Sequence, residues 1–240
     1  LGEAGYRAVA PDQRGYSPDA RPTEIEDYAY DLLMDDVLAM ADQLGADTFH
    51  LVGHDWGAVV AWGVAATAPE RVITLSAFSI PHPDALDAQL ADTTSCQYAA
   101  SAYFDFFANP GSEFALLADD AAILSGFYQG LAPEAVESYL EQLGTAPALG
   151  AALNWYRANL DGRRFSLGRL LGAVTVPTLY IWSSGDAAVC QDAAEATADF
   201  VTGPYRYEVI EGIGHFVPEE APDAVTELIL EQLDVVTETE

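Results

Sequence analysis

Basic residues are scarce in this sequence, and lysine is absent. The 240 residues include nine basic side chains, all of them arginines, against 38 acidic ones, which gives a formal net charge of −29. Proteins that bind nucleic acids or anionic membranes neutralise phosphate groups with clustered arginines and lysines. The composition therefore argues against nucleic acids and anionic membranes as partners.

Cysteine is scarce as well, and long apolar stretches are missing. The two cysteines, Cys96 and Cys190, are far apart and have no metal-ligand spacing. Two thiols do not make a disulfide framework, so with no evident signal peptide we expect a reducing, cytoplasmic compartment. No stretch approaches the ~18 uninterrupted apolar residues of a membrane span. Because half of the residues are hydrophobic, the chain can still bury a substantial core.

The excess of acids has two interpretations. Aspartate outnumbers glutamate and lysine is missing, a composition that keeps a protein soluble in high salt, where ions screen the repulsion between like charges. The alternative is an acidic enzyme with no salt requirement. Stability measured against KCl concentration separates the two.

The hydrophobic pattern predicts an α/β fold with a helical insertion. Gly5 is expected to end a helical turn, after which strands alternate with helices, as is typical of a parallel sheet covered by helices. The predicted strands are 6–11, 49–52, 71–78, 176–182 and 205–210, and the predicted core helices are 25–44, 58–67, 192–200 and 223–233. Between 81 and 171, helical segments follow one another without strands. We therefore expect a core formed by 1–80 and 172–240, with a helical cap of 81–171.

The strand at 49–52 leads directly into a helix through Gly53-His54-Asp55-Trp56-Gly57. Such a tight turn holds its middle residue in a strained backbone conformation, and bulky residues two positions away would clash. Gly53 and Gly57 avoid that clash, and the following helix N-terminus favours a negative charge on Asp55. The turn is similar to the nucleophile elbow of α/β hydrolases, with aspartate where many members carry serine. An aspartate that merely caps the helix is the alternative.

An ester formed on Asp55 needs a base that activates water. His215 lies in a glycine-rich loop after the last strand, where α/β hydrolases carry their histidine. Asp186 follows the strand at 176–182 and is the candidate that orients His215 and stabilises its charged form. The other histidines are expected to be structural or to point away from the nucleophile: His50, His54 and His82.

Two segments of the cap indicate the reaction. Residues 102–111 (AYFDFFANPG) and 152–157 (ALNWYR) resemble the cap segments of soluble epoxide hydrolases, in which a tyrosine pair reaches the substrate oxygen. Pro81-His82-Pro83, residues 12–16 (DQRGY) and the Gly-His-Asp-Trp-Gly turn are also similar to that family. The resemblance covers nearly the whole chain and implies an α/β-hydrolase core with a mostly parallel sheet and a helical cap.

Carried over to this sequence, the resemblance assigns Tyr103 and Tyr156 as proton donors, with Tyr98 as the fallback for the first. Asp55 would attack an epoxide carbon while the phenols protonate the opening oxygen, for which a donor with a pKa near ~10 is suited. The base would then activate water and release a vicinal diol. The implied partner is a small epoxide, and neither a cofactor nor a metal is implied.

Trp56 suits either of two leaving groups. Its backbone N–H would serve an oxyanion hole, while its ring would line an alkyl pocket or hold a halide. A dehalogenase on the same fold therefore stays an alternative, separated by assaying halide release against diol formation. A third hypothesis is that the protein is an inactive hydrolase relative that binds a small molecule or a partner.

The sequence departs from the family at its beginning. The family's first strands and its His-Gly-x-Pro loop, which supplies a second oxyanion donor, are missing from these 240 residues. The family's third strand lies between the strands that correspond to 6–11 and 49–52, so we expect a gap there and a chain that begins mid-domain, as a fragment or truncated product. Removing one oxyanion donor costs about 100- to 1,000-fold in other hydrolases.

Overall fold

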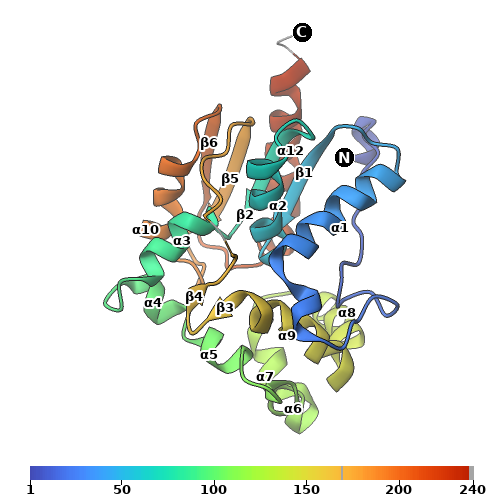
Figure 1. The fold of residues 1–240 in the computed structure, drawn as a ribbon, viewed down its shortest axis with the longest axis vertical. Coiled ribbons are helices and arrows are strands. Elements are labelled where there is room, and N and C mark those ends of the chain that lie inside the picture. The colour runs from blue at the N-terminus through green and yellow to red at the C-terminus, as the bar shows by residue number, and fades with distance from the viewer. Residues whose placement is uncertain (169, 238–240) are drawn as a thin grey trace.

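A computed structural model describes residues 1–168 and 170–237, of which 236 and 237 are described by their backbone alone. Its central sheet has four parallel strands, in the order β1 (Phe49–His54), β2 (Val72–Phe78), β5 (Thr178–Ser183) and β6 (Tyr205–Ile210). Helices cover both faces of this sheet, and a block of short helices lies below it in Figure 1. The predicted α/β fold with a parallel sheet is confirmed.

The helix α2 (Trp56–Thr67) fits closely onto one face of the sheet because nearly all of its residues are small or apolar. Its residues are buried from Trp56 to Ala65, with Gly57 as the exception. The helix α1 (Tyr30–Gln43) crosses α2 so closely that a Cβ on Gly63 would lie 2.2 Å from the Tyr30 hydroxyl. A side chain at position 63 would therefore displace the ends of the Tyr30 and Met34 side chains.

The opposite face of the sheet is covered by α12 (Pro222–Thr237). Leu179 and Ile181 of β5 point to this side and pack against Val225 and Ile229 of the helix. Tyr180 and Trp182, at the alternate positions of the same strand, belong to the core around α2. This alternation of side chains is expected for a strand that is buried on both faces.

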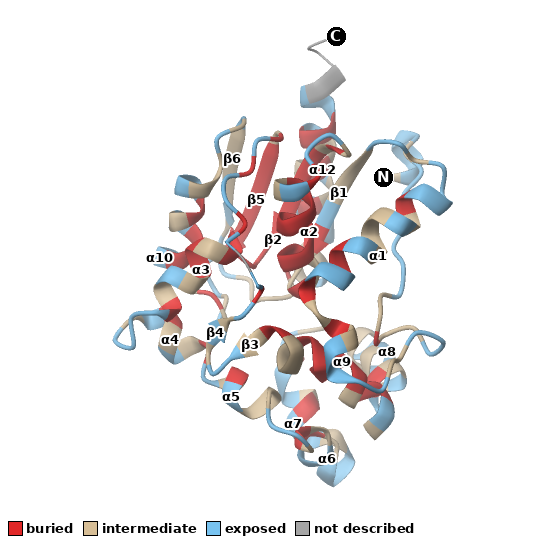
Figure 2. Cartoon of the chain, viewed as in Figure 1, coloured by how far each residue is buried: buried red, intermediate tan, exposed pale blue. Residues whose placement is uncertain are grey.

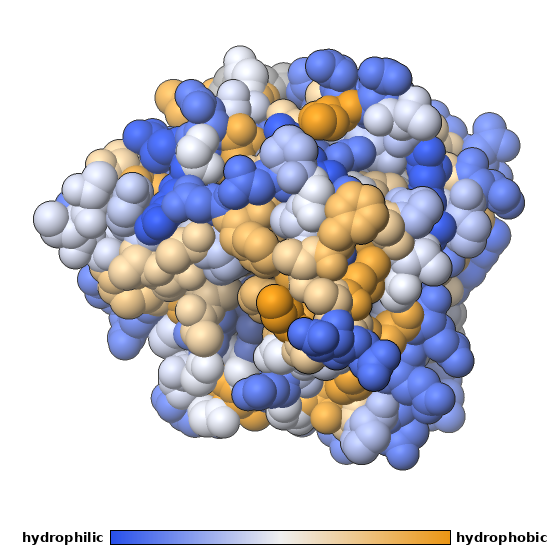
Figure 3. All heavy atoms as spheres, turned by 90° about the horizontal axis from the view of Figure 1, so that it is seen from below, coloured by the Kyte–Doolittle hydropathy of each residue, from blue (hydrophilic) through white to orange (hydrophobic). Residues whose placement is uncertain are grey.

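The predicted cap, residues 81–171, consists of short helices and one small hairpin. They are α3 (Pro83–Leu90), α4 (Cys96–Ala100), α5 (Tyr103–Phe107), α6 (Ser112–Leu116), α7 (Ala118–Phe127), α8 (Pro133–Leu143), α9 (Ala146–Asn159), β3 (Leu160–Asp161) and β4 (Arg164–Phe165). The helix α9 is largely buried (Figure 2) and contacts α5, α6 and α8. Viewed from below, the molecule shows apolar surface among hydrophilic side chains (Figure 3), and the exposed apolar residues of α6 and α7 include Phe114 and Ile123.

Residues 6–11 do not form the predicted buried strand. They have no regular secondary structure, and most of them are exposed, Val9 by 52%. A strand needs a neighbour that satisfies its backbone N–H and C=O groups. In the part of the chain that the structure describes, the sheet ends at β1, and no strand pairs with its outer edge. The segment therefore forms no strand, although its apolar pattern is typical of one.

The other predicted core elements are confirmed, with shifted ends. The predicted helix 25–44 is interrupted at Ala29, whose ψ of 144° is extended, so a short turn η2 (Ile25–Tyr28) precedes α1. The predicted helix 192–200 is likewise divided into α10 (Gln191–Glu195) and the turn η3 (Ala196–Phe200). Gly5 ends the turn η1 (Gly2–Ala4) in a left-handed conformation, as predicted.

Two findings bear on the expectations from cysteine and from apolar runs. Cys96 of α4 and Cys190, which precedes α10, form a disulfide, with Cα atoms 6.2 Å apart. The prediction of a reducing compartment was based on two cysteines outside any disulfide framework. The structure joins them instead, because two elements that are 94 residues apart in sequence meet in the fold. Among the described residues, no helix is long and apolar enough to cross a membrane.

Candidate active site

Asp55 occupies the turn between β1 and α2, in a backbone conformation that residues with a side chain rarely adopt. Its φ is 53° and its ψ is −128°, which is the strain that the sequence predicts for this position. A Cβ on Gly53 would lie 2.4 Å from the carbonyl oxygen of Gly57, so position 53 requires glycine. A Cβ on Gly57 would meet only the side chain of Gln13, at 3.7 Å, so the steric requirement predicted for position 57 is not found.

The structure brings Asp55, His215 and Asp186 together from three separate parts of the chain. The His215 Nε2 atom lies 3.2 Å from a carboxylate oxygen of Asp55, and its Nδ1 atom lies 2.8 Å from a carboxylate oxygen of Asp186. The Asp186 side chain is fully buried. Ionised carboxylates only accept hydrogen bonds, so the imidazole donates from both ring nitrogens and is positively charged in this arrangement.

The charges of this trio stabilise one another. Burial lowers the pKa of His215, but its hydrogen bonds to Asp186 and Asp55 and the charges of both carboxylates outweigh burial and raise that pKa to about 10. Burial also disfavours the charged form of Asp55, yet the hydrogen bond from His215, the positive charge of His215 and the backbone N–H of Trp56 lower its pKa overall. Asp55 is therefore an anion at neutral pH, and His215 is its cationic partner.

His54 belongs to the site, although the sequence predicts that it points away. Its Nε2 atom donates a hydrogen bond to the backbone carbonyl of His215 at 2.9 Å, and the Ser79 hydroxyl donates to the same oxygen at 2.7 Å. Burial and then the positive charge of His215 lower the pKa of His54, so this ring stays neutral. The two donors fix the loop that carries His215. The sequence feature that could have indicated this role is the position of His54, directly before Asp55 at the end of β1.

Tyr103 and Tyr156 line the same narrow, mostly apolar pocket as Asp55. The remaining lining residues are largely apolar: Trp56, Val59, Ile80, Leu86, Phe104 and Phe165. The rings of the two tyrosines are 6.3 Å apart, and the Tyr156 ring packs edge-on against the Trp56 ring, with ring centres 5.2 Å apart. Tyr98 instead stacks with Arg163 outside this pocket, so the fallback is not needed.

The two phenols are held in their protonated form. Burial, followed by the negative charge of Asp55, raises the pKa of Tyr103 and of Tyr156 well above the ordinary value of 10.0. Both groups can therefore donate a hydrogen bond across the neutral and mildly alkaline range. The pocket thus places a carboxylate anion opposite two neutral proton donors.

The residues that flank Tyr156 in the Asn-Trp-Tyr-Arg segment explain its position. The Trp155 indole donates to the carbonyl of Arg14 at 2.8 Å, which connects α9 to the loop after residues 6–11. Arg157 pairs with Glu113 of α6 at 2.6 Å. Arg14 itself forms two hydrogen bonds with Asp36 of α1, which hold its loop in place. The Arg14 loop and α6 therefore both fix the helix that carries Tyr156.

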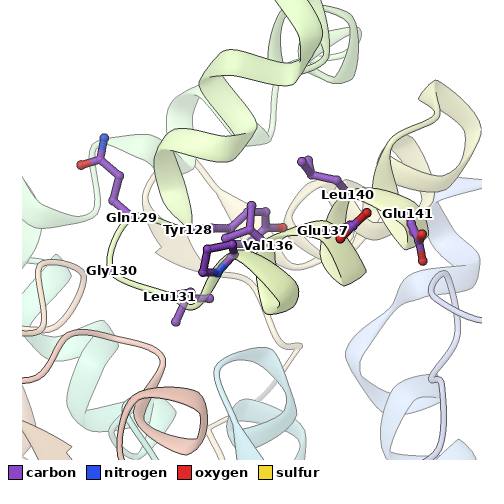
Figure 4. A pocket seen from close by; sticks show the side chains of 9 residues that line it. Tyr128, Gln129, Gly130, Leu131, Val136, Glu137, Leu140 and Glu141 are labelled. Carbon is purple, nitrogen blue, oxygen red and sulfur yellow. The ribbon is translucent and has the colours of Figure 1, made fainter.

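Further tyrosines near Asp55 are missed by the sequence analysis. Burial and then the charge of Asp55 raise the pKa of Tyr16, and the same two causes raise the pKa of Tyr128 to about 12. Tyr128 also lines a second hollow, a surface groove of about 640 Å³ between the end of α7 and α8 (Figure 4). It stacks on Tyr139, and both rings contact Phe216 next to His215. Aromatic rings thus connect the groove wall to the loop of His215.

No cluster of metal-ligating side chains is present in the described residues.

Known proteins are similar to this chain over most of its length. A family model described as the alpha/beta hydrolase fold matches residues 1–222. The AB hydrolase superfamily protein YfhM of Bacillus subtilis is 35% identical over 97% of this chain and 82% of its own length. Epoxide hydrolase A of Mycobacterium tuberculosis is 29% identical over 97% of this chain and 83% of its own length.

Solved structures described as epoxide hydrolases are also similar to this chain. A structure described as one of the novel epoxide hydrolases from metagenomes of hot environments is 33% identical, covers 93% of this chain and 80% of its own, and has a TM-score of 0.81. Epoxide hydrolase VrEH1 from Vigna radiata is 27% identical, covers 97% and 83% of the two chains, and has a TM-score of 0.82.

Proposed function

The chain belongs to the α/β-hydrolase family, and we propose that it hydrolyses epoxides to vicinal diols through an ester on Asp55. The observation that supports this proposal is the position of Asp55, which has the His215–Asp186 pair on one side and two protonated phenols in the same pocket. Relatives and structural neighbours named as epoxide hydrolases support the same reaction class.

In the first step, a carboxylate oxygen of Asp55 attacks one epoxide carbon. The bond between that carbon and the epoxide oxygen breaks, and the oxygen takes a proton from Tyr103 or Tyr156 while the other phenol donates a hydrogen bond. The lowered pKa of Asp55 keeps the nucleophile ionised, and the raised pKa values of the phenols keep the donors protonated. The product of this step is an alkyl ester on Asp55.

Ester formation changes the state of His215. Esterified Asp55 has no negative charge, so one of the two carboxylates that raise the pKa of His215 is lost and that pKa falls. The imidazole can then release its proton, which restores the phenol that protonated the epoxide oxygen, and accept a new one from a water molecule. The oxygen of that water bonds to the carbonyl carbon of the ester, whose carbonyl oxygen is stabilised by the backbone N–H of Trp56. The bond from this carbon to the alkyl oxygen then breaks, His215 gives its proton to the alkyl oxygen, and the diol leaves. The first step thereby prepares the base for the second.

Halide release is less well supported as the reaction. A departing halide needs no proton, and an indole N–H would suffice for it. In the structure, two protonated phenols share the pocket with Asp55, as proton donation to an epoxide oxygen requires. An assay that detects halide from haloalkanes and no diol from epoxides would replace the proposal with this alternative, and no product from either would favour the inactive relative.

The decisive experiment combines a panel of epoxides with substitution of the nucleophile. Wild-type protein should form diol from at least one epoxide, and Asp55→Ala should abolish turnover because no ester can form. Asp192→Ala is a matched control, since it removes an exposed carboxylate from α10 without touching the pocket. Diol formation by Asp55→Ala at the wild-type rate would exclude Asp55 as the nucleophile.

The partner is a small electrophile, and the net charge of −29 argues against nucleic acid. A cytoplasmic location stays a prediction. It was based on a reducing compartment, and the Cys96–Cys190 disulfide argues against such a compartment.

A further inference from the structure

The loop that carries Asp186 determines where its carboxylate points. One carboxylate oxygen accepts the hydrogen bond from His215 at 2.8 Å. The other accepts two backbone N–H groups, from Ala188 at 2.7 Å and from Val189 at 3.1 Å. The orientation of Asp186 relative to His215 therefore depends on the backbone at 188 and 189.

The same stretch of backbone is held from the other side by Gln97 of the cap helix α4. The Gln97 amide nitrogen donates to the carbonyl of Ala188 at 2.8 Å, and its amide oxygen accepts the N–H of Cys190 at 2.9 Å. Its second amide hydrogen is directed to the hydroxyl of Ser101, at 3.0 Å. With 2% of its surface exposed, Gln97 is a buried polar side chain whose partners fix its orientation.

A covalent bond lies beside this amide. Cys96 precedes Gln97 and forms the disulfide with Cys190, the residue whose N–H the glutamine accepts. Consecutive residues of α4 thus hold the loop once by hydrogen bonds and once by a disulfide. We propose that Gln97, with the Cys96–Cys190 disulfide, is a positioning residue that sets Asp186 against His215 and so controls the second half of the reaction.

This inference rests on the proposed function, and the two half-reactions separate its consequences. Attack by Asp55 uses its own carboxylate and the phenols, and it does not require Asp186. Hydrolysis of the ester requires a neutral His215 that Asp186 orients towards water. Loss of the Gln97 hydrogen bonds should therefore slow ester hydrolysis more than ester formation, and the ester should accumulate.

The test is Gln97→Met, which keeps the length of the side chain and removes its hydrogen bonds. With an epoxide that wild-type protein hydrolyses, rapid quenching and protein mass spectrometry give the rates of ester formation and of ester loss. We expect ester loss to be about tenfold slower, as removal of one or two hydrogen bonds implies, with ester formation changed less than twofold. The pH midpoint of ester hydrolysis should move to lower pH, because a displaced Asp186 no longer raises the pKa of His215 as strongly.

Gln232→Met is the matched control. Gln232 is equally buried, with 3% of its surface exposed, but lies on α12, away from the pocket and from the loop of Asp186. It should leave both the ratio of the two rates and the pH midpoint unchanged. Reduction of the disulfide in folded wild-type protein with a dithiol should change the same ratio in the same direction as Gln97→Met, by a smaller factor, because the hydrogen bonds remain.

The outcomes distinguish this inference from the proposed function. If wild-type protein forms no ester with any epoxide, the proposed function is wrong. If ester forms and is hydrolysed, but Gln97→Met slows both steps equally or neither, the positioning role is wrong. Should Gln97→Met not fold, an unchanged ratio after reduction of the wild-type disulfide overturns the coupling of α4 to Asp186.

Discussion

The two halves of the pocket are built by different means. On the core side, the Asp55–His215–Asp186 trio is held by directional hydrogen bonds from His54, Ser79 and backbone groups. On the cap side, Tyr103 and Tyr156 are surrounded by aromatic rings such as Phe104 and Phe107. Hydrogen bonds weaken steeply when their angle departs far from linear, whereas the hydrophobic effect has no direction.

The difference separates chemistry that must not vary from contacts that can adapt. Proton transfer at His215, between Asp55 and Asp186, needs fixed distances. In the proposed reaction the substrate lies against the aromatic rings of the cap side, whose apolar contacts have no fixed direction. We therefore expect substitutions on the core side to stop the reaction at one step, and substitutions on the cap side to change its rate and its substrate range.

The largest effect is expected for His215→Gln on the core side. Glutamine cannot accept the proton from water, so ester hydrolysis should fall roughly 1,000-fold while ester formation continues. Mass spectrometry should then find protein heavier by the mass of the epoxide. Release of diol at the normal rate would show that His215 is not the base.

Removal of a phenol should act on the other step. Tyr103→Phe and Tyr156→Phe should each lower the rate of ester formation by about 100-fold, because the opening oxygen loses one donor, with ester hydrolysis nearly unchanged. Tyr205→Phe is the control, since that hydroxyl on β6 is buried without a hydrogen-bond partner, away from the pocket. Equal rates in the cap variants and in this control would remove the distinction between the two halves.

Proton binding tests the core side directly. In Asp55→Ala, His215 loses one hydrogen bond and one neighbouring charge, so its pKa should fall below the wild-type value of about 10. Because the folded-state pKa exceeds the unfolded value near ~6.5, His215 stabilises wild-type protein fully below that pH, and this contribution is lost as the pH rises towards 10. NMR titration of the imidazole gives the pKa, and denaturant unfolding against pH gives the stability. An unchanged pKa would contradict the ion pair.

A smaller effect is expected where the cap side uses a hydrogen bond of its own. Trp155→Phe removes the bond to the Arg14 carbonyl, at a cost of about 1 to 2 kcal/mol in unfolding free energy. Because this bond positions α9, ester formation should slow several-fold and hydrolysis should not. A loss of stability without any change in ester formation would limit the bond to folding.

The smallest effect on the comparison is expected from salt, which acts on the whole surface. With a net charge of −29, unfolding free energy should rise between low salt and molar KCl, because ions screen the mutual repulsion of the acids. The ratio of the two reaction steps should stay the same. Equal stability with and without KCl would contradict the high-salt interpretation and leave an ordinary acidic enzyme.

Much of the fold could be predicted because local pattern and topology agree. The turn at Asp55 has glycine where a Cβ would collide with backbone, and the alternation of strands and helices is regular on both sides of the cap. The prediction of a strand at 6–11 is wrong because local pattern and topology disagree there. The pattern of these residues is that of a strand, but a strand is stable only beside another one, and sequence periodicity contains no information on the neighbour.

The site could be predicted where roles follow chain order, and not where they depend on contacts. Asp186 and His215 each follow a core strand, so their meeting with Asp55 was expected from topology. The Cys96–Cys190 bond and the Gln97 contacts join residues about ninety positions apart, the first between two side chains and the second between a side chain and backbone groups. His54 was set aside because neighbours in a turn usually diverge, yet here it supports the backbone of the base.

The Cys96–Cys190 bond closes a covalent ring that contains most of the cap and the strand β5. Consider a protease that cuts one peptide bond inside this ring, for example near exposed Phe114. The two fragments stay covalently joined and should migrate as one species in electrophoresis without reductant. The same cut followed by a thiol should separate them. Damage to the outer helices is thus contained, and nicked molecules keep their two parts at high local concentration.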